Sequence, residues 1–519
     1  MSASNKDREM LGTCIEYGPN IFNSDNCIHH PLDTQIISEL TTLYNQIGSE
    51  ADDFEIFKYR EDSIDSLWRL LIEKSIKCLR FFDSREPFSG NAEKAPMAYG
   101  VDKLKKYYDD YTEFERVLYG SSKYYRDHVI HVFRTWLSGV VTLINNNGQF
   151  LNFIQVQEKE EVHISEHEKL SMWTIIALTH DLGYPLEQAT KIIDTTRDMV
   201  STFVTNPGIS MDLSFHGVQN YMNDFIVRLI SSKMVAIGVS DQLTTQQYVA
   251  RLQPKYYFKF QKSLEKTKHG IVSTLIIYKL LTYFLESDYS INEDYMFDEE
   301  ERRQFYIRRE ILRAIASHTC KDVYHLYLGS FAFLLILSDD TQEWGRKYLS
   351  ELYVRRNHEY YLNEIGITLS EDTAKSPHNC TIDEEISIPE GSGGVIDLLS
   401  RLHDQSLDYI TIFRDGQDTE KRDFSFNRKF VIKHPGNIVF SMELQIKKDG
   451  ASELVGNINY TATGTTNKKF GEVFFKELQK LGIVDNDNAW EVFSNDGNPA
   501  EKSSPEQWRS GKFAITLIS

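Results

Sequence analysis

The sequence predicts a mainly α protein of 519 residues with a smaller C-terminal α+β domain. Three observations support this prediction. Apolar residues recur at helical spacing through much of residues 1–368. Residues 369–396 are rich in turn formers and acidic residues, which is typical of a linker. Beyond this, short runs of β-branched and aromatic residues indicate strands in residues 397–519.

Residues 1–110 are predicted to form a helical N-terminal extension. Ile36, Leu40 and Leu43 are spaced as on one face of a helix, and residues 67–79 repeat this pattern. We expect these helices to extend or cap the segment that follows.

The most informative motif is the adjacent pair His180 and Asp181. The preceding residues 172–178 are almost wholly apolar, which is typical of a core helix. Gly183 and Pro185 are expected to end that helix, because Gly tolerates the left-handed conformation and Pro cannot continue a helix. A buried aspartate needs a partner, and a metal ion is one.

Further metal-ligand candidates lie at or near the edges of other apolar helical segments. His128 and His131 head a narrow polar stripe that is expected to face an internal site. A lone buried histidine is more often satisfied by hydrogen bonds. Here, however, His269, His318 and Asp339 follow in similar settings, and this favours a metal centre.

In this order of His, His-Asp, His, His and Asp, the chain resembles the HD superfamily of metal-dependent phosphohydrolases. The resemblance covers roughly residues 110–365, and we assign residues 111–368 to an HD-type domain. It implies that one metal is held by His131, His180, Asp181 and Asp339. It further implies that His269 and His318 complete a second metal site and that Asp181 bridges the two ions.

Two choices within this ligand set rest on the family pattern. His131 is preferred to His128 because Arg134 follows it by three residues, as an arginine often does in the family. Asp339 is preferred to Asp340 because a small residue after an apolar run usually precedes the family's last aspartate, and Ser338 matches this.

The resemblance implies a metal-dependent phosphohydrolase, a phosphodiesterase or a nucleotidase, acting on a nucleotide or related phosphate ester. Imidazole and carboxylate ligands suit divalent ions, and the resemblance implies two, drawn from Mn, Fe, Ni, Co, Zn or Mg. Two such ions, roughly 3.5–4 Å apart, activate a water that attacks phosphorus.

Three residues are assigned catalytic roles. Asp181 bridges the metals, His128 acts as general acid, and Arg346 stabilises charge on the phosphoryl oxygens. The alternatives are a hydrogen bond to a metal ligand for His128 and a salt bridge for Arg346. Other candidate cations are Arg126, Arg134, Lys266 and Lys268, and weaker site candidates are Tyr184, Glu187 and His325.

Other functions stay open. Gly183 is followed by Tyr184, where members that open cyclic dinucleotides often carry Lys, and no substrate-specific subfamily is supported. The same residue order resembles the di-iron inositol oxygenase branch. A catalytically silent, ligand-binding regulatory protein is a third interpretation.

Two segments have no predicted catalytic role. Residues 201–262 form an aromatic-rich insertion that either shapes the pocket or adds helical packing. In the tail, residues 428–433, 438–446 and 513–518 read as strands and residues 470–481 as an amphipathic helix. We expect an independently folding α+β accessory domain that senses a ligand, binds a partner or mediates self-association.

The net charge of −19 argues against broad binding of duplex nucleic acid or of an anionic membrane surface. It leaves room for a local basic pocket that binds a small phosphate-containing substrate. No apolar run approaches the roughly 20 residues needed to span a bilayer. The five cysteines form no Cys-x-x-Cys pair, and no secretory signal is evident, so a cytoplasmic location is the default. The oligomeric state stays open, a homo-oligomer included.

Overall fold

The computed structural model describes most of the chain. The described residues are 3–22, 31–47, 63–83, 98–121, 128–146, 150–157, 160–205, 208, 218–237, 246–287, 289, 295–320, 329–342, 361–371, 377–387, 424–433, 438–448, 454–462, 490–493 and 510–517. Helices predominate among them, which confirms the mainly α class.

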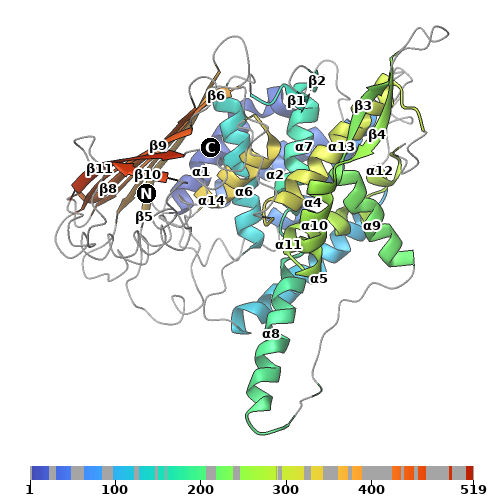
Figure 1. Ribbon diagram of the computed structural model, residues 1–519, viewed down its shortest axis with the longest axis horizontal. Helices are drawn as coiled ribbons and strands as arrows, with labels where there is room; N and C mark the ends of the chain where they lie inside the picture. The colour runs from blue at the N-terminus through green and yellow to red at the C-terminus, as the bar shows by residue number, and fades with distance from the viewer. Residues whose placement is uncertain are drawn as a thin grey trace.

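A helical body and a seven-stranded sheet lie side by side (Figure 1). The helices are α1 (Ala3–Phe22), α2 (Pro31–Gln46), α4 (Asp65–Asp83), α5 (Val101–Ser121), α6 (Val129–Asn145), α7 (Glu166–Thr179), α8 (Tyr184–Ser201), α9 (Val218–Ser231), α10 (Pro254–Glu265), α11 (His269–Leu280), α12 (Thr282–Leu285), α13 (Glu299–Ser317) and α14 (Phe331–Thr341). None of the described helices is both long enough and apolar enough to cross a membrane.

The two predicted N-terminal helices are present as α2 and α4, and α1 precedes them. Helix α4 turns Leu67, Trp68 and Leu71 into the core. The indole Nε1 of Trp68 donates a hydrogen bond of 3.0 Å to the carbonyl oxygen of Leu178 in α7. This bond joins the N-terminal helices directly to the helix that leads into the His-Asp pair.

Helices α6 and α7 pack closely against each other. The indole Nε1 of Trp173 donates to the carbonyl oxygen of Trp136, and that of Trp136 donates to the hydroxyl of Thr174, both at 3.0 Å. A Cβ placed on Gly139 would lie 2.0 Å from the Trp173 ring, so only glycine fits there. Since α6 carries His131 and α7 leads to His180, this packing fixes two candidate ligands relative to each other.

The segment expected to be an insertion is regular where the structure describes it. It contains α9, the hairpin of β3 (Ser232–Ile237) and β4 (Gln247–Leu252), and α10. The hydroxyl of Tyr306 accepts a hydrogen bond of 2.9 Å from the backbone N–H of Met234, which attaches the hairpin to α13. A second, two-stranded hairpin is formed by β1 (Phe153–Gln157) and β2 (Glu160–His163).

The large sheet has the strand order β10-β11-β9-β8-β7-β6-β5 and is antiparallel except between β6 and β7. Its strands are β5 (Tyr361–Glu371), β6 (Pro377–Ser387), β7 (Phe424–Lys433), β8 (Ile438–Lys448), β9 (Leu454–Ala462), β10 (Trp490–Phe493) and β11 (Ser510–Leu517). The three predicted strands correspond to β7, β8 and β11. The predicted helix at residues 470–481 lies outside the described residues.

The predicted linker at residues 369–396 is wrong in its first half. Residues 377–387 are strand β6, and β5 has already begun at Tyr361. Cys380, Ile382 and Ile386 alternate along β6 and are buried, which is the pattern of a strand with one covered face. The turn-forming and acidic residues around this short pattern made it read as a linker.

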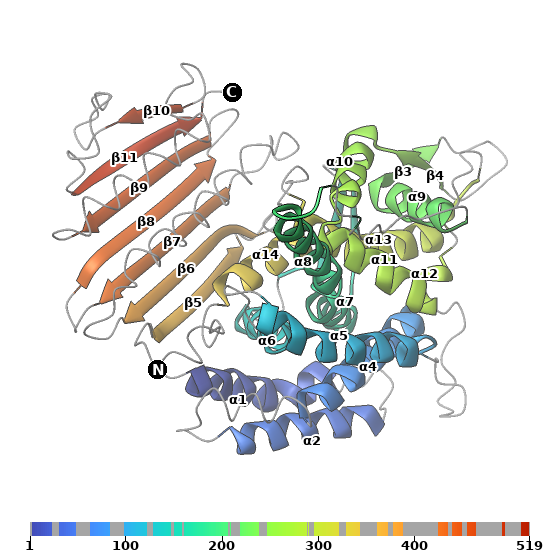
Figure 2. The same ribbon diagram turned by 90° about the horizontal axis from the view of Figure 1, so that it is seen from below.

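The sheet packs on the helical body through α14, which lies between them (Figure 2). The ring of Phe333 in α14 meets that of Phe426 in β7 edge-on, with centroids 6.4 Å apart. Ile382, Phe426 and Ile432 belong to the same buried hydrophobic cluster as the helical core. The described strands therefore pack on the helical body, and independent folding of the tail stays a prediction.

Candidate metal centre

All six sequence-predicted metal ligands lie close together, and four of them stand at or next to a helix end. His180 is the C-cap of α7, with Asp181 following it, and His318 is the C-cap of α13. His269 is the first residue of α11. His131 lies in the first turn of α6 and Asp339 near the end of α14.

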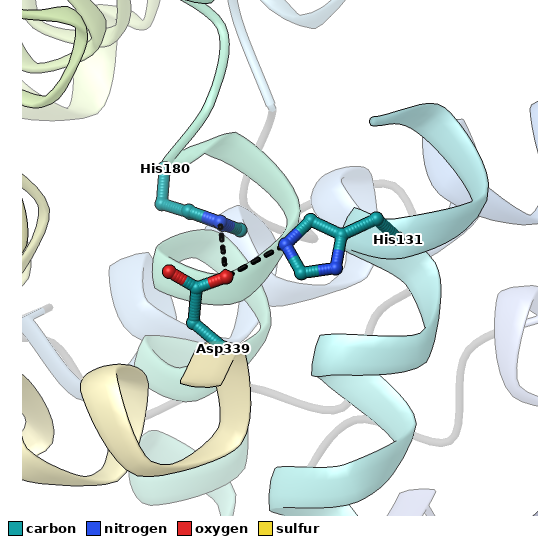
Figure 3. Close-up of side chains that lie close together, drawn as sticks. All are labelled: His131, His180 and Asp339. Atoms are coloured by element: carbon teal, nitrogen blue, oxygen red, sulfur yellow. Dashed lines mark hydrogen bonds and ion pairs between the residues drawn. The ribbon is translucent and has the colours of Figure 1, made fainter. Parts of the chain in front are cut away.

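The first group consists of His131, His180 and Asp339, whose ligand atoms lie near enough to share one ion (Figure 3). Oδ1 of Asp339 is 2.7 Å from Nε2 of His131 and 4.0 Å from Nε2 of His180. Asp339, rather than Asp340, thus supplies the carboxylate of this group.

The second group surrounds Asp181. Its Oδ1 lies 3.3 Å from Nε2 of His269 and 3.6 Å from Nε2 of His318. Its Oδ2 lies 3.4 Å from Nε2 of His180, which also belongs to the first group. One carboxylate therefore faces both groups with different oxygen atoms, as a bridging ligand would.

All four histidines are held by their Nδ1 atoms. The Nδ1 atom of His131 contacts the side-chain oxygen of Gln342, and that of His180 contacts the carbonyl oxygen of Ala177 at 2.8 Å. The Nδ1 atom of His269 contacts Oε2 of Glu187 at 2.7 Å, and that of His318 contacts the carbonyl oxygen of Ile315 at 2.6 Å. Such contacts fix the orientation of a metal-binding imidazole and leave its Nε2 for the ion. Every Nε2 in this set points to Asp181 or Asp339.

Two of these Nε2 atoms, on His180 and His318, are buried and accept or donate no hydrogen bond within the described structure. Because each ring donates from Nδ1 to a carbonyl, the neutral ring has its Nε2 lone pair directed at a carboxylate oxygen. A lone pair facing an acceptor is unfavourable unless a cation lies between them. The donor set thus fits a divalent transition metal ion.

The site is charged in a way that suits a cation. Burial alone raises the pKa of Asp181, but the neighbouring imidazoles outweigh it and hold that pKa well below its usual range. Asp339 has its pKa lowered in the same way, against burial, by His131. Burial lowers the pKa of His180 and favours the neutral ring that a metal requires.

His269 differs from His180. Burial opposes its charged form, but hydrogen bonds to Asp181 and Glu187 outweigh burial and raise its pKa to about 9. Below this pH the metal-free ring carries two protons, and an ion that takes its Nε2 displaces one of them.

Glu187 was only a weak candidate from sequence, yet it organises one side of the site. Besides Nδ1 of His269, its Oε2 accepts a hydrogen bond of 3.0 Å from the backbone N–H of the same residue. Its Oε1 lies 3.1 Å from Nζ of Lys268 and 3.3 Å from Nζ of Lys191. The usable sequence signal was an acidic residue in the first turn of the helix that follows the His-Asp pair.

Replacing Glu187 with glutamine is therefore expected to weaken metal binding by about 10–100-fold, the usual effect of removing a carboxylate that orients a ligand. Titration of the metal-free protein with Mn²⁺ or Zn²⁺ measures it. The matched control is Glu265→Gln, which changes an exposed acid on α10. Equal affinities for the two variants would refute an orienting role for Glu187.

The turn after the His-Asp pair requires glycine for a different reason from the one expected. Gly183 has a φ of −81°, which any residue adopts, rather than a left-handed conformation. A Cβ there would lie 2.4 Å from the carbonyl oxygen of His269, so glycine permits close approach to α11. Ser273 of α11 completes the contact, since its hydroxyl accepts from the N–H of Gly183 at 2.8 Å and donates to the carbonyl of His180 at 2.7 Å.

His128 lies beside the cluster but is not part of it. Its ring stacks on Tyr184 with centroids 3.8 Å apart, and Tyr184 in turn meets His269 edge-on at 5.3 Å. Glu115 accepts a hydrogen bond of 2.7 Å from the backbone N–H of His128, and its carboxylate lies 3.8 Å from Nδ1. His128 is thus held within reach of the site by α5 and α8.

Three of the five cations predicted from sequence lie in the described residues. Arg134 forms a buried, two-pronged ion pair with Asp7 of α1, so its charge is already neutralised. Lys268 is paired with Glu187, and Lys266 is an exposed residue after α10. Arg126, His325 and Arg346 lie outside the described residues.

Comparisons of this chain with protein-family models, with curated proteins and with solved structures give no match.

Proposed function

We propose that this protein is a metal-dependent phosphohydrolase that cleaves a nucleotide or a related phosphate ester. The observation that supports it most is the convergence of four imidazole Nε2 atoms on two carboxylates, with every Nδ1 already held by another group. The order of these ligands along the chain, which resembles the HD superfamily, supports it independently.

Two divalent ions held by the six ligands would supply Lewis acidity toward phosphoryl oxygens and a water of lowered pKa. The chain's own residues define how a substrate reaches this centre. The side chains of Asp339 and His269 are 27% and 18% exposed, whereas those of His131, His180 and His318 are at most 3% exposed. A substrate therefore approaches past Asp339 and His269.

The residues before His269 favour an anionic substrate. Residues 251–268 contain six basic residues and one acidic residue, in a chain whose net charge is −19. Lys255, Lys259, Lys262 and Lys266 recur at helical spacing along α10 and share one face. This local positive charge lies just before His269 in the chain and favours the binding of phosphate groups in a protein whose net charge repels them.

His128 is our candidate for the proton donor to the leaving group. Imidazole is the side chain whose ordinary pKa lies nearest neutrality. Its stacking on Tyr184 and its contact with Glu115 restrict the ring's orientation, which a positioned general acid requires.

The adjacent residues Asp339 and Asp340 provide the test. We would measure bound metal and release of phosphate or nucleoside from a nucleotide panel, with Mn, Fe, Mg, Ni or Co supplied, for the wild type, Asp339→Ala and Asp340→Ala. The proposal predicts turnover that Asp339→Ala abolishes and Asp340→Ala retains. Metal binding without phosphate release on any substrate would overturn it, and oxygen uptake by the iron-loaded protein would identify an oxygenase instead.

A further inference from the structure

Helix α13 carries five arginines, which differ in how their charges are balanced. Three of them lie within 3.0 Å of a carboxylate: Arg302 of Glu299, Arg303 of Glu168 and Arg308 of Asp83. The other two, Arg309 and Arg313, are one helical turn apart and approach no carboxylate this closely within the described part of the chain. A charge that is buried without a close partner is costly, so these two arginines need another explanation.

Arg309 is the more buried of the two, with a side chain 6% exposed. Of its five N–H groups, one on Nη1 donates a hydrogen bond of 3.2 Å to the carbonyl oxygen of Ser232, the first residue of β3. Its Nε is buried and has no hydrogen-bond partner among the described residues. The carboxylate of Glu310 lies 3.9 Å from Nη2, which is beyond hydrogen-bonding distance. The guanidinium therefore has buried N–H groups left to donate.

Arg313 adds a second positive charge next to Arg309. Its guanidinium lies 4.1 Å from the ring centroid of Tyr256 in α10, and it forms no ion pair with any residue that the structure describes. Burial first, and the charge of Arg313 second, lower the pKa of Arg309, and the opposing effect of Glu310 is smaller. Two guanidinium groups thus share one nearby carboxylate, and the local charge is positive.

The N-terminus of α10 contributes further positive charge at the same place. Tyr256 lies in the first turn of this helix, which contains no acidic residue, and the N-cap Gln253 makes no side-chain hydrogen bond to it. The N-terminal end of a helix dipole favours an anion and disfavours a cation. Arg313 is therefore held beside a helix end that repels its charge, and an anion between them would balance both.

These two arginines face away from the candidate metal centre. His318 caps the same helix, and successive residues of a helix are turned by about 100°. Arg313 and Arg309 thus lie about 140° and about 180° around the axis from His318. They contact α10 and β3 instead, and β3 lies at the end of the helical body far from the sheet (Figure 2). The two arginines therefore belong to a different site from the metal ligands.

We propose that Arg309 and Arg313 bind the phosphate group of a small molecule between α13, β3 and the start of α10. A guanidinium presents its N–H groups in a planar fork that matches phosphate oxygens, and helix N-termini bind the same group. A phosphate group, with a charge of about −1.5 to −2 at neutral pH, balances the excess positive charge better than a single carboxylate does. Arg313 is half-buried, so the ligand enters past it. The proposal does not depend on the enzymatic activity.

Equilibrium dialysis of the metal-free, full-length protein against radiolabelled inorganic phosphate, at constant ionic strength, tests this site. Removing metal ensures that no ion at the candidate metal centre holds the phosphate. The wild type should bind one phosphate per chain. Arg309→Met and Arg313→Met should each weaken binding by about 10-fold or more, the effect of losing a hydrogen bond to a charged group. Because Arg313 is only half-buried, Arg313→Met should keep the helical circular dichroism of the wild type.

Arg228→Met is the matched control. Arg228 also lies over a tyrosine ring, that of Tyr257 at 5.3 Å, but it is paired with Asp224 at 2.7 Å. This variant should bind phosphate as the wild type does. A wild type that binds no phosphate, or a control that loses binding as much as Arg313→Met does, would overturn the proposal.

Competition identifies the source of the phosphate group. Unlabelled AMP that displaces the label at lower concentration than unlabelled phosphate would identify a nucleotide as the ligand, and the reverse order would identify free phosphate. Either order supports the site, provided that Arg313→Met weakens the better competitor by the same factor as the label. Competition by AMP that is unchanged in Arg313→Met would place the ligand elsewhere and refute the assignment.

Discussion

Asp181→Asn is expected to abolish turnover, by about 10³-fold or more, and to weaken binding of both metal ions. Asparagine keeps the shape of the side chain but removes the charge that offsets an ion on each side. Metal should also stop stabilising the protein: an ion present at about 100 times its Kd adds about 2.7 kcal/mol to the wild type. Thermal unfolding with and without Mn²⁺ measures this, and the variant should show almost no shift.

The control for Asp181→Asn is Asp340→Asn, which removes a carboxylate next to Asp339 that is not in the cluster. It should retain the metal-induced shift of the wild type. If Asp181→Asn bound metal as well as this control does, Asp181 would not be a ligand and the two-ion interpretation would fail.

Arg134→Met is expected to destabilise the protein by about 3–5 kcal/mol, because it leaves the carboxylate of Asp7 buried without its counter-charge. The two side chains are 3% and 5% exposed, and the guanidinium reaches both carboxylate oxygens, Oδ1 at 2.9 Å from Nε and Oδ2 at 2.7 Å from its terminal nitrogen. Urea unfolding monitored by helical circular dichroism measures the loss.

Two further variants test whether burial is the reason that the Arg134–Asp7 pair affects stability. Asp7→Leu combined with Arg134→Met should recover most of the stability, since no unpaired charge then remains. Arg69→Met breaks an exposed pair with Asp102, whose side chains are 49% and 86% exposed, and should cost less than about 1 kcal/mol. Similar losses for Arg69→Met and Arg134→Met would contradict the role of burial.

The sequence was sufficient to find the residues whose side-chain chemistry is rare in an apolar setting. The six ligands stood out because imidazole and carboxylate groups interrupt segments that are otherwise apolar, and the structure brings all six together. The resemblance to the HD superfamily, through the small residue Ser338 after an apolar run, was enough to predict that Asp339, not Asp340, joins the cluster.

What the sequence could not provide was the set of contacts between distant segments. Gln342 orients His131 across 211 residues, and nothing local distinguishes it from other polar residues at helix ends. Glu187 was a weak candidate, but its contact with His269, 82 residues away, was not predictable. Arg134 illustrates the same limit, because its partner Asp7 lies 127 residues away on α1. Strand β6 was not predicted because a short alternating pattern forms a stable strand only when neighbouring strands pair with it, and its pairing with β5 and β7 is not visible in the sequence.

Helix α14 contacts the sheet with one residue and the candidate metal cluster with another. Phe333, which touches the sheet at Phe426, and Asp339, which joins the metal cluster, are six residues apart in this helix, about 9 Å along its axis. Because a helix of this length moves as a rigid rod, a displacement of β7 that shifts Phe333 also shifts Asp339 relative to His131. The seven-stranded sheet and the candidate metal cluster are therefore joined through a single short helix, so that a change in the packing of β7 on Phe333 would be transmitted to the position of Asp339.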